Sequence, residues 1–72
     1  MDETLDDYLY EVINKYEREG DWRLGQTYFN VLTEFNPRLA EQVRGSALDP
    51  FYQDIRIVEF LAFVGENWRE SK

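Results

Sequence analysis

The chain has 72 residues and contains neither Cys nor His. These absences exclude disulfide bridges and thiolate chemistry and remove the side chain most often used as a general base or metal ligand. Its 15 acidic and 8 basic residues give a net charge of −7 at pH 7, whereas proteins that bind DNA or RNA directly carry a basic surface. We therefore expect a single domain over residues 1–72 that is not an enzyme, needs no cofactor or metal and does not bind nucleic acid itself.

The N-terminal segment is acidic, with carboxylates at four of the six positions in residues 2–7, where a signal or transit peptide is basic. The longest apolar run covers residues 60–64, far short of the roughly 20 residues that a membrane helix needs. These features predict a cytoplasmic protein that does not enter the membrane.

The first helix is predicted over residues 5–19. Thr4 and Asp7 have the spacing of a capping box, and apolar residues follow at the i, i+3, i+4, i+7 spacing of an amphipathic helix. These residues are Leu5, Tyr8, Leu9, Val12, Ile13 and Tyr16. Gly20 in a left-handed conformation and Asp21 as the next N-cap would make a tight turn into a second helix over residues 22–35.

The second predicted helix is apolar over more than a third of its circumference, which indicates a central position in the fold. Asn36 followed by Pro37 ends it and is also a start signal for a short helix over residues 37–44, closed by Gly45. Gly25 lies inside the second helix, where glycine usually marks the close approach of another backbone.

Asp49–Pro50 repeats the cap-then-proline signal and predicts a short helical turn over residues 49–52. In that segment we expect Phe51 to plug the bundle and Tyr52 to lie at the surface. The last helix is predicted over residues 54–69, and its apolar residues occupy most of its circumference, so we expect it to be covered on most sides. Gly65 in this helix predicts a second close packing contact.

Together these segments predict an all-α fold, a small bundle of three main helices and one short helix. The chain has twelve aromatic residues (five Phe, five Tyr and two Trp), more than so small a bundle can enclose. Four of them fall off the main apolar stripes and are expected to be exposed or covered by a partner: Tyr10, Tyr52, Phe60 and Phe63.

The negative charge is concentrated at the N-terminal end. Residues 1–21 hold eight acidic and two basic residues, a net charge of −6, and residues 22–72 hold seven and six, a net charge of −1. Glu3, Asp7 and Glu11 are successive i, i+4 neighbours at roughly 6 Å intervals, an interval comparable to that of DNA phosphates. The row is flanked by Asp2 and Asp6. It predicts a phosphate-like face that occupies the basic nucleic-acid-binding cleft of a protein partner.

A structural interpretation accounts for much of the same pattern. Acids in a first helical turn stabilise the helix dipole by roughly 0.3–1 kcal/mol each, and a charged face keeps a small protein soluble. Against this interpretation, like charges at i, i+4 destabilise a helix, and within the row only Glu11 has an opposite charge, Lys15, at this spacing.

Two further hypotheses are disfavoured. A single helix cannot wrap a metal ion, and a helix-turn-helix reading DNA through Arg38, Gln42 and Arg44 would be repelled by the net charge.

A longer pattern runs through the middle of the chain, made of residues 22–32, Pro37, Arg44–Gly45 and Asp49–Pro50–Phe51–Tyr52. Over about residues 20–68 this pattern resembles short, functionally unassigned acidic proteins of bacteriophages and bacteria. The resemblance brings no activity, catalytic residue or cofactor with it. The resemblance implies a phage-type origin. Such an origin favours a small protein that binds a host enzyme and disables or redirects it, and several inhibitors of this kind mimic DNA in their charge layout.

The sequence thus predicts a small acidic interaction protein that inhibits or modulates a nucleic-acid-handling protein by DNA mimicry. The residues predicted to contact the partner are Asp2, Glu3, Asp6, Asp7, Tyr10, Glu11, Tyr52, Phe60 and Phe63. The alternative is a structural protein that forms a homodimer through its last helix, with the acidic face serving solubility.

Overall fold

The computed structural model describes residues 3–68, which contain four α-helices, one short 3₁₀ helix and the loops between them, with no strand in this part of the chain. The elements are α1 (Leu5–Arg18), α2 (Leu24–Phe35), α3 (Pro37–Val43), η1 (Asp54–Arg56) and α4 (Ile57–Asn67). The all-α prediction is confirmed. None of the helices in the described part of the chain combines the length and the apolar character needed to cross a membrane.

Helix α1 begins with the predicted capping box. The Asp7 backbone N–H donates to the Thr4 hydroxyl at 3.1 Å, and the Thr4 N–H donates to the Asp7 carboxylate at 3.1 Å. Two backbone donors that the first helical turn leaves without partners are satisfied in this way. Helix α3 is capped as predicted too, because the Asn36 side chain accepts from the Leu39 N–H at 3.2 Å.

The start of α2 differs from the prediction. The helix begins two residues later than expected, and Arg23 is its N-cap instead of Asp21. The Arg23 backbone N–H donates to the Gln26 side chain at 3.4 Å, and its guanidinium donates to the Phe51 carbonyl. Gln26 stands three residues after Arg23, which is the capping-box position for a helix that begins at Leu24.

Two glycines were predicted to close helices, and the prediction is right for Gly45 but wrong for the left-handed conformation of Gly20. Gly45 closes α3 with φ +74° and is the only described residue with a positive φ. Gly20 does not adopt it, because the chain leaves α1 through a turn closed by a hydrogen bond from the Trp22 N–H to the Glu19 carbonyl at 3.1 Å.

The predicted helical turn over residues 49–52 does not form. The Asp49 carboxylate accepts from the backbone N–H groups of Gly45 at 2.8 Å and of Phe51 at 2.9 Å. It therefore ties the loop back to the end of α3 instead of capping a helix, and regular structure resumes only at η1. Phe51 packs against the core and Tyr52 is exposed, both as predicted.

The two helical glycines have different environments. A Cβ at Gly25 would lie 2.2 Å from the Pro50 carbonyl oxygen, and the Gly25 N–H donates to the Asp54 carboxylate at 2.9 Å, so the predicted close contact is confirmed. At Gly65 the nearest atom would be Leu5 Cδ2 at 3.9 Å, an ordinary van der Waals distance. The prediction of close packing at Gly65 is wrong, since α1 approaches α4 there only with a side chain.

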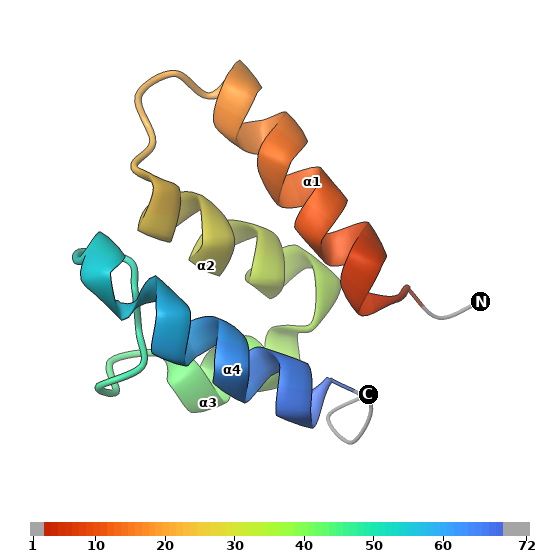
Figure 1. Cartoon of the computed structure of the whole chain (residues 1–72), viewed down its shortest axis with the longest axis vertical. Helices are drawn as coiled ribbons and strands as arrows, with labels where there is room; N and C mark the ends of the chain where they lie inside the picture. Colours follow the sequence, from red (N-terminus) through yellow and green to blue (C-terminus); the bar gives the residue numbers. More distant parts are fainter. Residues whose placement is uncertain (1–2, 69–72) are drawn as a thin grey trace.

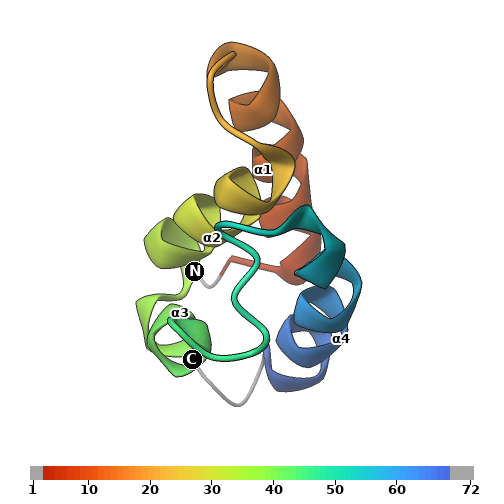
Figure 2. The ribbon, with the colours of Figure 1, turned by 90° about the vertical axis from the view of Figure 1, so that its left-hand side faces the viewer.

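Helix α2 occupies the central position that its sequence predicted, packed against α1, α3 and η1 (Figures 1 and 2). The core consists of Tyr8, Val12, Phe29, Val31, Leu32, Leu39, Ala40, Val43, Phe60, Val64 and Trp68. The prediction that the last helix is covered on most sides is wrong, because Val58 is 77% exposed and Ile55 in η1 is 85% exposed. Only one side of α4 faces the core.

Candidate functional site

The predicted carboxylate row on α1 is partly engaged within the molecule. Asp7 belongs to the capping box with Thr4. Glu11 forms an ion pair with Arg18 at 3.2 Å, and its side chain is only 29% exposed. Two of the three carboxylates that were predicted to imitate phosphates therefore stabilise α1 itself.

The remaining acids at the start of the chain have separate surroundings. Asp2 lies outside the described residues. Glu3 is exposed, and its backbone carbonyl accepts from the Trp68 indole N–H at 3.2 Å, which ties the start of α1 to the end of α4. Asp6 is exposed in the first turn of the helix, where its charge is favourable to the helix dipole.

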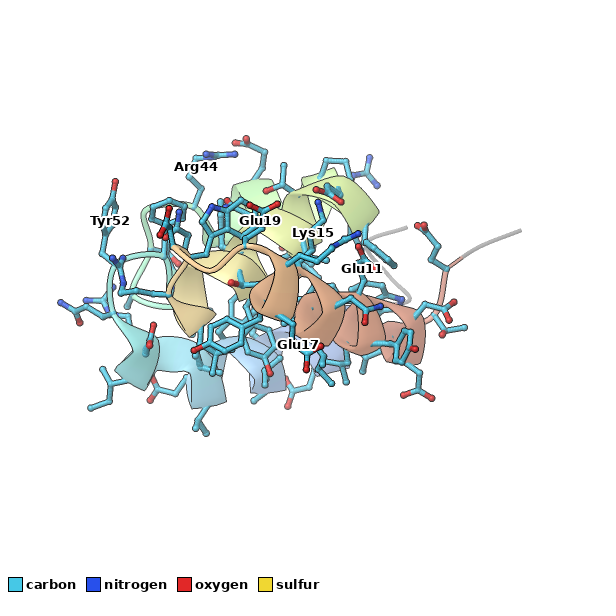
Figure 3. All side chains as sticks on the ribbon, turned by 90° about the horizontal axis from the view of Figure 1, so that it is seen from above. Glu11, Lys15, Glu17, Glu19, Arg44 and Tyr52 are labelled. Atoms are coloured by element: carbon cyan, nitrogen blue, oxygen red, sulfur yellow. The ribbon has the colours of Figure 1, made fainter. Side chains whose placement is uncertain are left out.

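Both cations of α1 are neutralised by intramolecular partners. Lys15 lies 3.6 Å from the carboxylate of Glu34 on α2, and Arg18 pairs with Glu11. The expected i, i+4 pair between Glu11 and Lys15 is not the one that forms, because Lys15 points toward α2. Figure 3 shows Glu17 on the side of α1 opposite to Glu11 and Lys15.

Three acids gather at the C-terminal end of α1 and in the turn that follows: Glu17, Glu19 and Asp21, all exposed. Among the described residues, none of the three carboxylates forms an ion pair. Negative charge at a helix C-terminus is unfavourable to the helix dipole. Neither capping nor the helix dipole therefore explains these three residues, whereas capping explains Asp7 and the dipole explains Asp6.

The four aromatic residues that were predicted to contact the partner do not lie together. Tyr10 on α1 is 68% exposed and Tyr52 in the loop before η1 is 80% exposed, so both are available to a partner. Phe60 is fully buried, and its assignment as a contact residue is wrong: it faces α2, with its ring 6.1 Å from that of Tyr28. Phe63 is half-buried against the core.

A shallow groove of about 680 Å³ lies between α2 and the loop after α3. Its lining residues are Trp22, Phe29, Asn30, Thr33, Glu34, Arg44, Gly45, Asp49, Phe51 and Tyr52. The Arg44 guanidinium lies 5.2 Å from the Phe29 ring centre, and the Phe51 ring meets Phe29 edge-on at 6.0 Å. Arg44 also pairs with Glu41 at 3.2 Å. The charged and aromatic side chains of this groove therefore contact one another or neighbouring residues of the chain.

The sequence did not reveal that several residues of the apolar stripes are exposed. Ile13 and Tyr16 were assigned to the buried stripe of the first helix, yet Ile13 is 57% exposed and Tyr16 is exposed as well. Ile55 and Val58 were assigned to a covered helix and are exposed too. The one available signal was the width of the apolar stripes, which exceeds the roughly 100° that a surface helix needs.

The acidic side chains do not converge on a metal-binding arrangement: within residues 3–68, no group of three or more carboxylates lies close enough together to hold a metal ion. Comparisons with protein-family models, with curated proteins and with solved structures gave no match to this chain. The resemblance of residues 20–68 to acidic phage and bacterial proteins therefore stays a prediction.

Proposed function

We propose that this chain is a non-enzymatic binding protein that engages a basic surface of a nucleic-acid-handling protein and thereby inhibits or modulates it. The acids at the C-terminal end of α1 and in the following turn supply the negative surface. A partner that normally holds phosphates would attract this surface over long range and bind it in the place of nucleic acid.

The observation that supports this proposal best is the unneutralised charge of Glu17, Glu19 and Asp21. The nearby cations Lys15 and Arg18 are paired with other carboxylates, and the helix dipole disfavours acids at this end. Charge kept where it costs stability is typical of residues that serve binding. We therefore propose a partner-facing charge further along α1 than the one that the sequence predicted.

Capture of partners from a cell lysate by the immobilised chain tests the proposal. We compare the wild type with the variant Glu17→Gln, Glu19→Gln, Asp21→Asn, at about 50 mM and about 300 mM salt, and identify retained proteins by mass spectrometry. We expect DNA- or RNA-handling proteins on the wild type at low salt, lost at high salt and on the variant.

A control variant separates local from total charge. Glu3→Gln, Glu41→Gln, Glu70→Gln changes the net charge by the same amount but leaves the end of α1 intact. We expect it to retain the same proteins as the wild type. Equal loss on both variants, or retention of no nucleic-acid-handling protein, contradicts the proposal.

A further inference from the structure

Helices α1 and α4 meet at only one end. The Trp68 indole donates to the Glu3 carbonyl at 3.2 Å, and the Tyr8 and Trp68 rings are 5.3 Å apart. From there the two helices diverge, with α2 lying between and behind them, as both ribbon views show (Figures 1 and 2). The Tyr28 ring of α2 lies 6.4 Å from that of Tyr8 and 6.1 Å from that of Phe60, so α2 forms the floor between the diverging helices.

The side of α1 toward α4 is apolar and open. Leu5 is the residue of α1 nearest to Gly65 of α4, which fixes the direction of this side. Leu9, Ile13 and Tyr16 continue from Leu5 at helical spacing. Ile13 and Tyr16 are exposed, and Figure 1 shows α1 and α4 apart toward the C-terminal end of α1.

The corresponding side of α4 is apolar too. Leu61 precedes Gly65 by one helical turn and is half-buried, and Val58 lies one turn before Leu61 and is exposed. Ile55 in η1 extends this surface beyond the start of the helix. We call this surface the α1–α4 face: Leu9, Ile13, Tyr16, Ile55, Val58 and Leu61.

Acidic residues border the α1–α4 face on both helices, whereas the nearby cations Lys15, Arg18 and Arg56 bind Glu34, Glu11 and the Ser46 carbonyl. Glu17 lies on the side of α1 opposite to Lys15 (Figure 3), and Asp6 lies on the same side as Glu17, three turns earlier. Glu59 and Glu66 are the only charged residues within α4. An occupant of this face therefore needs an apolar stripe bordered by positive charge.

We propose that the α1–α4 face is the docking site of a basic amphipathic helix of the partner. A helix laid between two diverging helices buries its apolar stripe against both, and its Lys or Arg residues then meet the acidic border. A second copy of this chain fits less well, because it would bring Asp6 and Glu17 against an equally acidic border. The inference rests on the proposed function for the sign of the partner's charge and adds the structural element that binds.

Binding of designed peptides to the full chain tests this inference by isothermal titration calorimetry. The probe is a helical peptide of about 18 residues made of Leu and Lys, with Leu at i, i+3, i+4 and i+7. One control has the same composition in an order that breaks the helical period, and the other has Glu in place of Lys. We expect the ordered Leu–Lys peptide to bind at least about tenfold more tightly than the scrambled one, and the Glu peptide not to bind.

Variants of the protein locate the binding site. We expect the double variant Ile13→Ser, Val58→Ser to weaken binding of the Leu–Lys peptide by about tenfold or more, and Tyr16→Ser to weaken it independently. These residues are exposed, so circular dichroism should show an unchanged fold. Tyr52→Ser removes an equally exposed side chain away from this face and should leave the affinity unchanged.

The outcomes separate this inference from the proposed function. Equal binding of the ordered and scrambled peptides means recognition by charge alone, which overturns the inference and leaves the proposed function standing. Binding of neither basic peptide contradicts both. A wild-type dimer that Ile13→Ser, Val58→Ser converts to a monomer identifies a second copy as the occupant and overturns the inference.

Discussion

At Gly25 the backbone of α2 approaches the loop before η1 so closely that one methyl group would collide with the Pro50 carbonyl oxygen, at 2.2 Å. We expect Gly25→Ala to lower the free energy of unfolding by about 2–3 kcal/mol. Gly65→Ala is the matched control, since the added methyl group meets only the Leu5 side chain at 3.9 Å. It should raise the free energy of unfolding by about 0.5–1 kcal/mol. Urea denaturation followed by circular dichroism measures both, and similar effects of the two variants would refute this account of the packing.

The buried phenol of Tyr8 makes the fold sensitive to alkaline pH. Its hydroxyl donates to the Tyr28 carbonyl at 2.7 Å, and burial, with the nearby Tyr28 phenol as a smaller cause, raises the pKa of Tyr8 well above its ordinary value of 10.0. The folded state therefore favours the neutral phenol, and this contribution is fully present below pH 10. Above pH 10 the unfolded chain loses the proton first, so stability should fall by up to about 1.4 kcal/mol per pH unit from this group.

The variant Tyr8→Phe isolates this effect. We expect it to cost about 1 kcal/mol at pH 7 through the lost hydrogen bond. The difference in melting temperature from the wild type should then shrink as the pH rises from 9 to 11. A difference that stays constant across this range would show that Tyr8 does not couple folding to pH.

Single residues were predictable from the sequence where their partners are local. Thr4, Asn36 and Gly45 act on atoms within a few residues, so their spacing alone defines the cap or turn. Asp49 has the same cap-then-proline signal, but its carboxylate binds Gly45 and Phe51 on both sides of it instead. The same short sequence pattern can cap a helix or close a loop, and the surrounding fold determines which of the two forms.

Helix α4 has one buried face and one exposed face, and substitutions on the two faces should differ in their effect on stability. Phe60 is fully buried, and Val58, two residues earlier, is exposed. We expect Phe60→Ala to cost about 3–5 kcal/mol of stability and Val58→Ala to change it by no more than about 0.5 kcal/mol. Thermal melting of the two variants checks this difference. Comparable losses would mean that Val58 is covered in solution, as a homodimer through α4 requires.

The C-terminal end of α1 should gain stability when its charge is removed. The variant Glu17→Gln, Glu19→Gln, Asp21→Asn relieves an unfavourable interaction with the helix dipole, worth roughly 0.3–1 kcal/mol per residue near the helix end. We expect a higher melting temperature together with weaker partner binding, and the gain should shrink with added salt. A lower melting temperature would show that these carboxylates have a structural role.

The helices themselves were predictable because their apolar periodicity and end signals are strong, and their ends fell within two residues of the prediction at α1, α2 and α3. How far each apolar stripe is covered was not predictable. Ile13 and Val58 lie on stripes that look buried in the sequence, but coverage depends on the angle between α1 and α4. No pattern within either helix encodes that angle.

The whole molecule is a thin slab, with extents of 31 × 27 × 17 Å. The shortest extent leaves room for about two layers of packed helices, so helices on its surface have core on one side only. This shape leaves apolar residues of α1 and α4 exposed beside a strongly acidic end.

The sequence shows that the negative charge is concentrated in the first 21 residues. It does not show that Glu11 pairs with Arg18 or that Lys15 pairs with Glu34.

We propose that the acidic end of α1 takes the place of nucleic acid on its partner. The most direct measurement is fluorescence anisotropy of a labelled DNA or RNA duplex bound to a captured partner, titrated with this chain. We expect the chain to displace the nucleic acid, less effectively as salt rises, and we expect Glu17→Gln, Glu19→Gln, Asp21→Asn to displace it at least about tenfold less well. A partner that binds this chain and nucleic acid at the same time, with unchanged anisotropy of the duplex, would contradict it.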